Sequence, residues 1–285
     1  MNLNEIAAKS LGSANSYAVY TDKYDTSLLN PMPRSLAREE YGVSVANGVD
    51  VWHCWETSFL LDNGAPVSGV TKFVYDANSP FMVESKSAKL FFNSFDMCKM
   101  GSTKETAIAA FEKIVADALS ECVGVQVEVK FFDHTVKQNM IGENELPSLD
   151  NKYCNVVTIT DYKLGENHLV KADGNFVSAK FVSMRSRCRH TKQKDTGVAY
   201  IHCTNVDECS LYEHCVSFRE KDEFHEFCAD KLWYDLSKFG KASVALCYNR
   251  RGSLDINPVR WSTSLPLALR EFINVDNLVK GSYTQ

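Results

Sequence analysis

The sequence predicts an α+β fold built from two related halves. Runs rich in Val, Phe, Trp and Thr and one alternating stretch predict strands, and apolar residues that recur at the three-and-four spacing predict helices. The order is strands, then two helices, then a strand, and it occurs twice along the chain. Because strands and helices do not alternate one by one, a doubly wound parallel sheet is not expected.

The first half begins with residues 1–47, which are expected to be irregular because of the turn signals at Asn30-Pro31 and Met32-Pro33. Runs rich in Val, Phe, Trp and Thr then predict two strands joined by a hairpin loop at 61–66. An amphipathic pattern follows, and Thr103 is expected to begin its longer helix. Strands are expected at 48–60, 67–77 and 124–133, and helices at 86–98 and 104–121.

The second half repeats this plan after a loop that contains Pro147. Strands are expected at 153–160, 177–185, 197–203 and 242–249, and helices at 209–218 and 222–239. We therefore expect two modules, residues 1–150 and residues 151–285. By length alone, a chain of 285 residues suits either one large domain or two domains of about 140 residues each.

Composition and charge exclude several classes of protein. The net charge of −5 argues against nucleic-acid binding as the main task, and no apolar run is long enough to cross a bilayer. The first residues lack the pattern of a signal peptide, so we expect a cytoplasmic protein with reduced thiols. The ten cysteines include no Cys-x-x-Cys pair, which disfavours a zinc site, and most are expected to be buried as small hydrophobes. No Gly-x-Gly-x-x-Gly or Walker A sequence occurs.

One cysteine stands in a densely basic stretch. Residues 184–197 read Met-Arg-Ser-Arg-Cys-Arg-His-Thr-Lys-Gln-Lys-Asp-Thr-Gly, with Cys188 followed seven residues later by Asp195. A thiolate needs nearby positive charge, and proton transfer needs a positioned acid. In an extended chain the two residues would lie roughly 23 Å apart, so they share a substrate only if the loop folds back, and Gly197 permits a turn there. Alone, the segment is more typical of a structural cysteine beside a solvated basic loop. The flanking cations are Arg187, Arg189, Lys192 and Lys194.

A second segment, Val83-Glu-Ser-Lys-Ser-Ala-Lys89, stands where a helix is expected to begin. Ser85 is expected to cap that helix. Its free backbone N–H groups, together with Lys86 and Lys89 on one face, would suit a phosphate. An ordinary capped helix with exposed lysines is the alternative.

Two later segments carry further candidates. His225 and Glu226 lie at the start of another expected helix, where the histidine is a candidate acid or base and the glutamate a candidate acceptor for the N–H donors of a purine-like edge. Arg250-Arg251-Gly252 follows the last expected strand and can approach a phosphate closely. Asp255 and Asn257, just beyond, are expected to stabilise a turn. Four aromatic residues are expected in the core: Trp52, Trp55, Phe91 and Phe95.

Taken together, these segments resemble one family, the bimodular NADPH-dependent 7-cyano-7-deazaguanine reductases of the queuosine pathway. The segment Tyr24-Asp-Thr-Ser-Leu-Leu-Asn-Pro-Met-Pro-Arg-Ser-Leu36 adds to the likeness, which runs in order over essentially the whole chain. The Glu-Ser-Lys-Ser-x-Lys motif is the most specific part, since it marks the reductase branch.

The resemblance implies tandem tunnelling-fold modules whose antiparallel sheets assemble into a barrel, and a homodimer. It implies that Cys188 attacks the nitrile carbon of 7-cyano-7-deazaguanine to form a covalent thioimide, that Asp195 protonates the nitrile nitrogen, and that two NADPH complete the reduction to the aminomethyl product. His225 would assist a later proton transfer. The substrate would be bound by Val83, Glu84, Ser85, His225 and Glu226. NADPH would be contacted by Ser85, Lys86, Arg251 and Gly252. No metal is expected.

This chain departs from the family pattern in two places. Lys194 and Thr196 stand where the family usually has Pro and Trp around the aspartate, and both neighbours of Cys188 are arginines where neutral residues are usual. Losing the Trp removes an apolar wall beside the acid, which needs a pocket that excludes water in order to donate a proton.

Two other functions stay open on the sequence. The first is an amidinotransferase that forms an amidine on a deazaguanine already in a nucleic acid, which the basic stretch at 185–194 would suit because it could meet phosphates. The second is a non-catalytic purine- or pterin-binding protein of the same fold.

Overall fold

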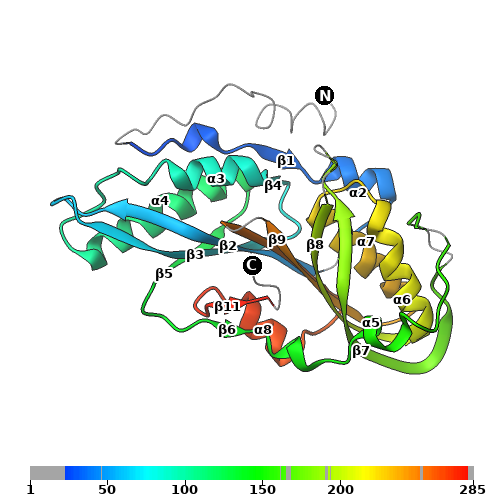
Figure 1. Cartoon of the computed structure of the whole chain (residues 1–285). Coiled ribbons are helices and arrows are strands. Elements are labelled where there is room, and N and C mark those ends of the chain that lie inside the picture. Colours follow the sequence, from blue (N-terminus) through cyan, green and yellow to red (C-terminus); the bar gives the residue numbers. More distant parts are fainter. Residues whose placement is uncertain are drawn as a thin grey trace.

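A seven-stranded antiparallel sheet forms the centre of the molecule (Figure 1). The computed structural model describes residues 23–45, 47–160, 162–164, 168–189, 192, 194–250 and 253–281. In spatial order the strands are β5 (Val127–Asp133), β3 (Pro66–Asp76), β2 (Asn47–Leu60), β10 (Leu254–Trp261), β9 (Ala242–Arg250), β8 (Lys194–Val206) and β7 (Lys171–Arg187).

The sheet joins the two halves of the chain at the pair β2–β10. In that pair Trp52 lies opposite Ile256, and Val49 lies opposite Val259. Strands of the first half lie on one side of this seam and strands of the second half on the other. The seam is therefore where residues from the two halves come closest to one another.

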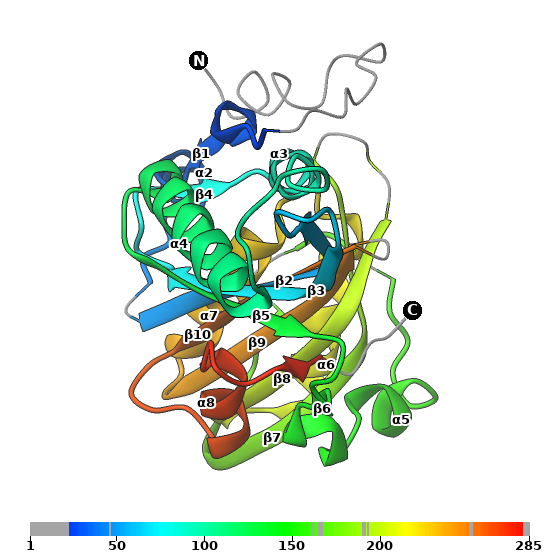
Figure 2. The same cartoon turned by 90° about the vertical axis from the view of Figure 1, so that its left-hand side faces the viewer.

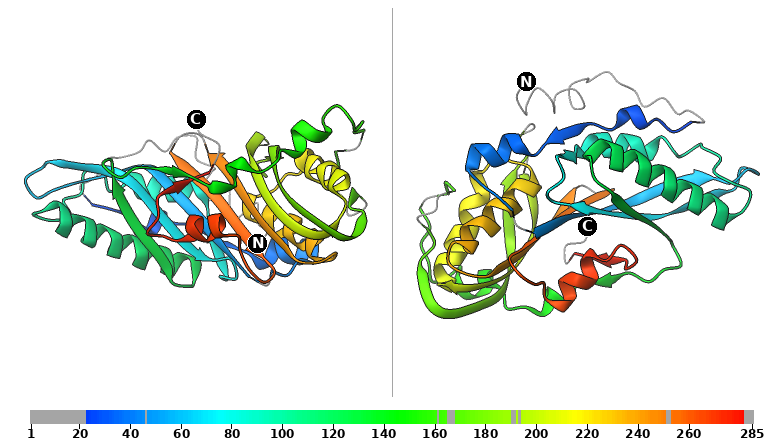
Figure 3. Two further views of the ribbon diagram at one scale, coloured as in Figure 1. Left: turned by 90° about the horizontal axis from the view of Figure 1, so that it is seen from below. Right: turned by 180° about the vertical axis from the view of Figure 1, so that it is seen from behind.

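Four helices cover one face of the sheet, two over each half, and a short one lies on the other face (Figures 1 and 2). The covering helices are α3 (Ser85–Asn93), α4 (Lys104–Val123), α6 (Glu208–Ser217) and α7 (His225–Ser237). The opposite face carries α8 (Leu267–Ile273), beside the short parallel pair β6 (Asn139–Met140) and β11 (Val279–Lys280). The views from below and behind show the same layers (Figure 3).

The remaining elements flank these layers. Strand β1 (Pro31–Pro33) pairs with β4 (Phe81–Val83), and α2 (Ser35–Tyr41) follows β1 and packs near α7. Helix α5 (Leu149–Tyr153) precedes β7. Short turns of 3-10 helix lie at Thr26–Leu28, Gly142–Glu145 and Phe218–Glu220. Among the described residues, no helix is both long enough and apolar enough to cross a membrane.

Each half has its own apolar core beneath its helices. Trp52, Phe73, Phe91 and Phe111 are fully buried in the first, and a second cluster packs α6 and α7 on strands β7, β8 and β9. Burying aromatic side chains of this size removes a large apolar area from water and dominates the stabilisation of such cores. Phe95 is also buried, as expected, whereas Trp55 is only half-buried and lies apart from both clusters.

Most predicted elements are confirmed. Strands β2 and β3 and their hairpin match the prediction, as do α4, α6, α7 and β9 within a few residues. Thr103 caps the start of α4, as expected, and its side chain forms a capping box with Thr106. Helix α3 ends at Asn93, five residues early, and β7 and β8 extend well beyond 177–185 and 197–203.

Three predictions are wrong. Residues 154–160 form no strand, because this apolar run lies on the surface, where Val156 is 72 % exposed. The segment 31–41, expected to be irregular, contains β1 and α2, while residues 1–22 lie outside the described part. Asp255 and Asn257 lie in β10, where the Trp55 indole and the Val51 carbonyl oxygen hydrogen-bond their side chains.

Candidate functional site

The candidate site lies over the seam between the two halves. Trp52 of β2 and Ile256 of β10 form its floor. Its walls come from the start of α3 and the start of α7, one helix from each half. The cavity has a volume of about 10 Å³, about enough for one water molecule, so a purine-sized ligand enters only if side chains move. The lining includes Val83, Glu84, Ser85, His225 and Glu226.

On the first wall, Glu84 caps helix α3. Its carboxylate accepts hydrogen bonds from the backbone N–H groups of Lys86 at 3.0 Å and Ser87 at 2.8 Å. Ser85 was expected to be the cap, but it is the first residue of the helix, because Glu84 already has the extended backbone of an N-cap. Two of the N–H groups predicted to suit a phosphate are thus taken by Glu84, which is 3 % exposed.

On the second wall, His225 and Glu226 are the first two residues of α7. Both are buried, and Phe224 before them offers no side-chain acceptor to cap the helix. The ring of His225 stacks on that of Tyr248 with centroids 3.8 Å apart. Stacking fixes the plane of the imidazole, so its Nε2 has a defined direction.

His225 connects this cavity to Asp195. Its Nε2 lies 3.3 Å from a carboxylate oxygen of Asp195, which is 8 % exposed. Asp195 itself does not line the cavity but lies on β8 just behind the histidine. An acid in this position is shielded from water, as proton donation to a substrate requires.

The β7–β8 hairpin brings Cys188 near Asp195. Asp195 lies opposite Ser186 in the strand register, two residues before Cys188, so the two Cα atoms lie roughly 8–10 Å apart. The prediction that this loop folds back is confirmed, and Cys188 is buried as a free thiol. The turn occurs at Lys192, whose φ is +58° and whose N–H bonds the Cys188 carbonyl oxygen.

Gly197 does not make the turn, contrary to the prediction. It lies within β8, opposite Met184 on one side and Tyr248 on the other. A Cβ on this glycine would stand 2.3 Å from the backbone oxygen of Cys247. Glycine is needed here because the neighbouring backbone approaches too closely for any side chain.

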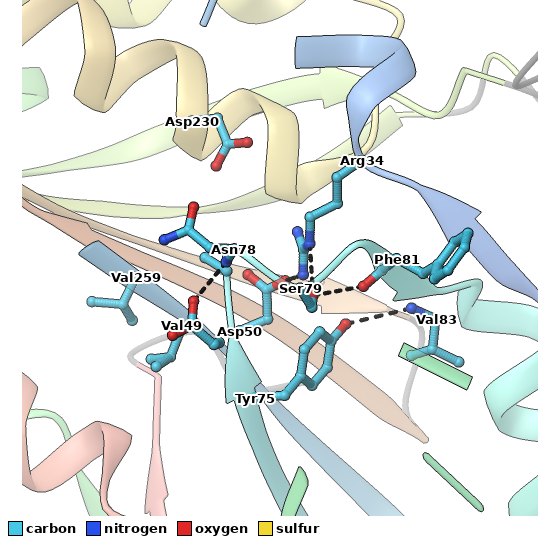
Figure 4. A network of polar contacts seen from close by, with 12 residues as sticks. Arg34, Val49, Asp50, Tyr75, Asn78, Ser79, Phe81, Val83, Asp230 and Val259 are labelled. Atoms are coloured by element: carbon cyan, nitrogen blue, oxygen red, sulfur yellow. Dashed lines mark hydrogen bonds and ion pairs between the residues drawn. The ribbon is translucent and has the colours of Figure 1, made fainter. Parts of the chain in front are cut away.

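A buried network of charges acts on Glu226, and Figure 4 shows three of its members, Arg34, Asp50 and Asp230. Arg34 and Arg260 both pair with Asp50, and Arg260 also pairs with Asp230 on α7 at 2.5 Å. All four groups are at most 1 % exposed. The network ties the start of α2, where Arg34 lies, to β2, β10 and α7, and so holds the helix that carries His225 and Glu226.

Burial raises the pKa of Glu226 to about 7, and the negative charge of Asp50 adds to this effect. The cations Arg34 and Arg260 act in the opposite direction but do not outweigh the loss of hydration. Near neutral pH, Glu226 therefore exists as a mixture of carboxylic acid and carboxylate.

The basic stretch around Cys188 is neutralised by acids. Arg187 pairs with Asp222 at 2.7 Å, and Lys192 pairs with the same carboxylate at 2.9 Å. Arg189 pairs with Glu223 at 2.9 Å and approaches Glu40 at 3.3 Å. These pairs offset the charges of three cations of the stretch, Arg187, Arg189 and Lys192.

Of the predicted cofactor residues, only two can be located. Ser85 lines the cavity and Lys86 follows it at the half-buried start of α3. Arg251 and Gly252 lie outside the described residues. A larger cavity of about 310 Å³ at the ends of β8 and β9, lined in part by His202, contains none of the predicted site residues.

Sequence reasoning missed the residues that support the site. Tyr248 and Asp50 carry no local motif, since one simply lies in a strand and the other in a hairpin. Arg34 stands within the N-terminal segment quoted above, but only the fold reveals that it reaches Asp50. A buried charge can be recognised only when its partners, distant in sequence, are brought to it.

Comparison with known proteins gives a consistent result. Residues 20–131 match the family model described as nitrile reductase, 7-cyano-7-deazaguanine-reductase N-terminal. The chain is 32 % identical to the NADPH-dependent 7-cyano-7-deazaguanine reductase of Colwellia psychrerythraea, over 92 % of this chain and 94 % of that protein. It is 33 % identical to the enzyme of the same name from Cupriavidus metallidurans, over 87 % of this chain and 92 % of the relative. It is 34 % identical to the enzyme of the same name from Burkholderia orbicola, over 90 % of this chain and 94 % of the relative.

Proposed function

Since this chain belongs to the family of NADPH-dependent 7-cyano-7-deazaguanine reductases, it is an oxidoreductase that reduces a nitrile, and we propose that it does so through a covalent thioimide on Cys188. The substrate is 7-cyano-7-deazaguanine and the product its aminomethyl derivative, which serves queuosine or a related 7-deazaguanine modification of nucleic acids.

One observation carries this proposal. Residues 83–85 of the first half and His225 and Glu226 of the second line the same cavity, and His225 lies 3.3 Å from Asp195. Glu84 and Glu226 both line the cavity, and a carboxylate suits the N–H donors of a guanine-like edge. This supports the proposal that Glu84 and Glu226 bind the deazaguanine, with Val83 and Ser85 beside it.

In the first step, the thiol of Cys188 adds across the carbon–nitrogen triple bond. The sulfur bonds to the nitrile carbon, and Asp195 donates a proton to the nitrogen, which gives a neutral thioimide. The thiol proton passes to a neighbouring base, so no charge is created overall. Asp195 is only 8 % exposed, which limits the access of water to its carboxyl group.

In the following steps, hydride adds to the same carbon, the thiolate leaves, and an imine forms. A second hydride and a proton convert the imine to the amine. The balance is one nitrile, two NADPH and two protons to one amine and two NADP⁺. His225, which contacts Asp195 and faces the cavity, relays protons to the nitrogen in this second stage.

NADPH, when bound, supplies the hydride. The start of α3 suits such a ligand, because Ser85, which lines the cavity, carries a hydroxyl group and Lys86, the next residue, carries a cation that can pair with a phosphate. The sequence resemblance assigns Arg251 and Gly252 to the same cofactor site. These residues bind and orient the dinucleotide, while the chemistry takes place at Cys188.

We further propose that residues 1–150 and 151–285 are two tunnelling-fold modules and that two chains form a homodimer. The edge strands support this, since β5 and β7 end the sheet, and β7 exposes Phe176 and Val182. A cytoplasmic location accords with the ten free thiols.

Mass spectrometry of the intact protein tests the mechanism. With 7-cyano-7-deazaguanine and no NADPH, the protein should gain the mass of one nitrile, and Cys188→Ala should gain none and turn nothing over. An adduct in the alanine variant, or NADPH oxidation at the unaltered rate, would contradict the role of Cys188. The amidinotransferase predicts an adduct that NADPH never consumes, and a binding protein predicts ligand retention without any adduct.

A further inference from the structure

We propose that Arg189 is a positioning residue, which holds Cys188 against the start of α7 through the buried carboxylate of Glu223. The inference rests on the proposed function, since it assumes that Cys188 attacks a ligand bound beside His225. It assigns a task to one of the two arginines that distinguish this chain from the usual family pattern.

The backbone on either side of these residues already runs in contact. The Arg187 N–H donates to the Lys221 carbonyl oxygen at 2.8 Å, and the Glu223 N–H donates to the Arg187 carbonyl oxygen at 3.0 Å. Cys188 directly follows Arg187 on one side of this short ladder, and His225 follows Glu223 by two residues on the other side. The nucleophile and the histidine therefore extend from a common anchor.

Glu223 is the centre of that anchor. Its side chain is 1 % exposed, and one of its carboxylate oxygens accepts hydrogen bonds from Tyr41 at 2.6 Å and Arg189 at 2.9 Å. The other oxygen accepts the N–H of Phe224 at 3.0 Å, immediately before α7. A single carboxylate thus joins the cysteine loop, the start of α7 and helix α2.

The two arginines beside Cys188 differ in their surroundings. The Arg187–Asp222 pair is 38 % and 30 % exposed, so water screens it and it restrains the chain weakly. Arg189 is 19 % exposed and its partner Glu223 is buried, so the loss of Arg189 leaves a buried carboxylate without its cation. Arg189 therefore restrains the loop more strongly than Arg187.

The charges of the cluster argue for a geometric role. Three cations, Arg187, Arg189 and Lys192, meet three anions, Glu40, Asp222 and Glu223. The six groups carry no net charge, and the guanidinium of Arg189 pairs with the buried carboxylate of Glu223. Arg189 is therefore assigned a role in placing Cys188.

The test compares adduct formation in full-length variants, by rapid quench and mass spectrometry with 7-cyano-7-deazaguanine. Arg189→Ala should slow the reaction about 10- to 100-fold, because a displacement on the order of 1 Å costs about that much. Arg189→Lys should recover part of the loss. Arg187→Ala, the matched control, should stay within about threefold of the unaltered protein.

Two further readouts separate positioning from other roles. In a Cys188→Ala background, Arg189→Ala should leave the nitrile affinity within about twofold, and the pH midpoint of adduct formation should move by less than about 0.3 units. Should Arg189→Ala fold poorly, Glu223→Gln tests the same link, because it keeps the shape and removes the charge.

Several results would overturn the inference. An unchanged rate in Arg189→Ala would do so, as would a parallel loss of rate and affinity, which marks a merely structural role. Full recovery of the rate at higher pH would indicate an electrostatic role instead. Failure of the unaltered protein to form any adduct would overturn the proposed function itself, and this inference with it, and is thereby distinguished from a defect confined to the variant.

Discussion

The ionisation of Glu226 makes substrate binding depend on pH. The carboxylate form accepts hydrogen bonds from a guanine-like edge, whereas the carboxylic acid presents a hydrogen in place of one acceptor. Because burial raises the pKa of Glu226 to about 7, the competent fraction is about 9 % at pH 6 and about 91 % at pH 8. The apparent Kd scales inversely with that fraction, so affinity should rise about tenfold between these pH values.

The measurement is calorimetric titration of the Cys188→Ala variant with 7-cyano-7-deazaguanine, because this variant binds without reacting. Glu226→Gln in the same background is the control, since glutamine does not titrate. Any pH dependence that survives in the control comes from another group, such as His225. Equal affinity at pH 6 and pH 8, or tighter binding at pH 6, would refute the reasoning.

The raised pKa of Glu226 also makes the stability of the fold depend on pH. Between about pH 4.5 and 7 the folded protein keeps a proton on Glu226 that the unfolded chain releases. Glu226 contributes about 3 kcal/mol to the free energy of unfolding below about pH 4.5, and this contribution is lost as the pH rises through 7. Glu226→Gln should remove that slope in urea titrations across this range.

Three other substitutions have defined outcomes. Lys86→Ala should raise the KM for NADPH about tenfold or more while sparing adduct formation, and equal loss of the adduct would contradict its assignment. Asp50→Asn leaves two buried arginines without their shared partner and should lower the free energy of unfolding in urea by about 3–5 kcal/mol. The control is Lys113→Ala, which removes an ion pair with Asp117 whose side chains are 75 % and 68 % exposed, and it should change the free energy of unfolding by less than about 1 kcal/mol. Gly197→Ala should cost about 3 kcal/mol because its Cβ meets a backbone oxygen, against about 1 kcal/mol for Gly64→Ala, where the strain is only that of a φ of +86°.

The sequence predicts those helices and strands whose side chains pack directly in the core. The runs rich in Val, Phe, Trp and Thr identify β2 and β3, and the apolar stripe identifies α4, because these side chains pack in the same core cluster. The run at 154–160 was misleading, since an apolar segment does not form a strand without a partner to pair with. Its exposed Val156 illustrates that local composition does not decide where a segment lies.

Strand β10 was missed for a physical reason. Asp255, Asn257 and Pro258 are typical of turns, yet they lie in the middle of the sheet. The polar side chains are satisfied by Trp55 and the Val51 carbonyl oxygen, and the pairing with β9 is interrupted at Asn257 and Pro258, where proline offers no N–H. Such compensation depends on residues about 200 positions away in the chain.

The residues of the candidate site also fall into a group that the sequence predicts and a group that it does not. Its motif residues could be named from the sequence, because chemistry restricts which residue types serve each step. The residues that hold them, such as Asp50, Tyr248 and Glu223, belong to no motif and become visible only when the fold assembles them.

The central claim, four-electron reduction of a nitrile through Cys188, is tested most directly by the stoichiometry of cofactor use. Purified protein, limiting 7-cyano-7-deazaguanine and excess NADPH should consume two NADPH for each nitrile and release the aminomethyl product, and Cys188→Ala should consume none. Cysteine adduct formation without NADPH oxidation, or oxidation of one NADPH per nitrile with an imine-derived product, would contradict the account.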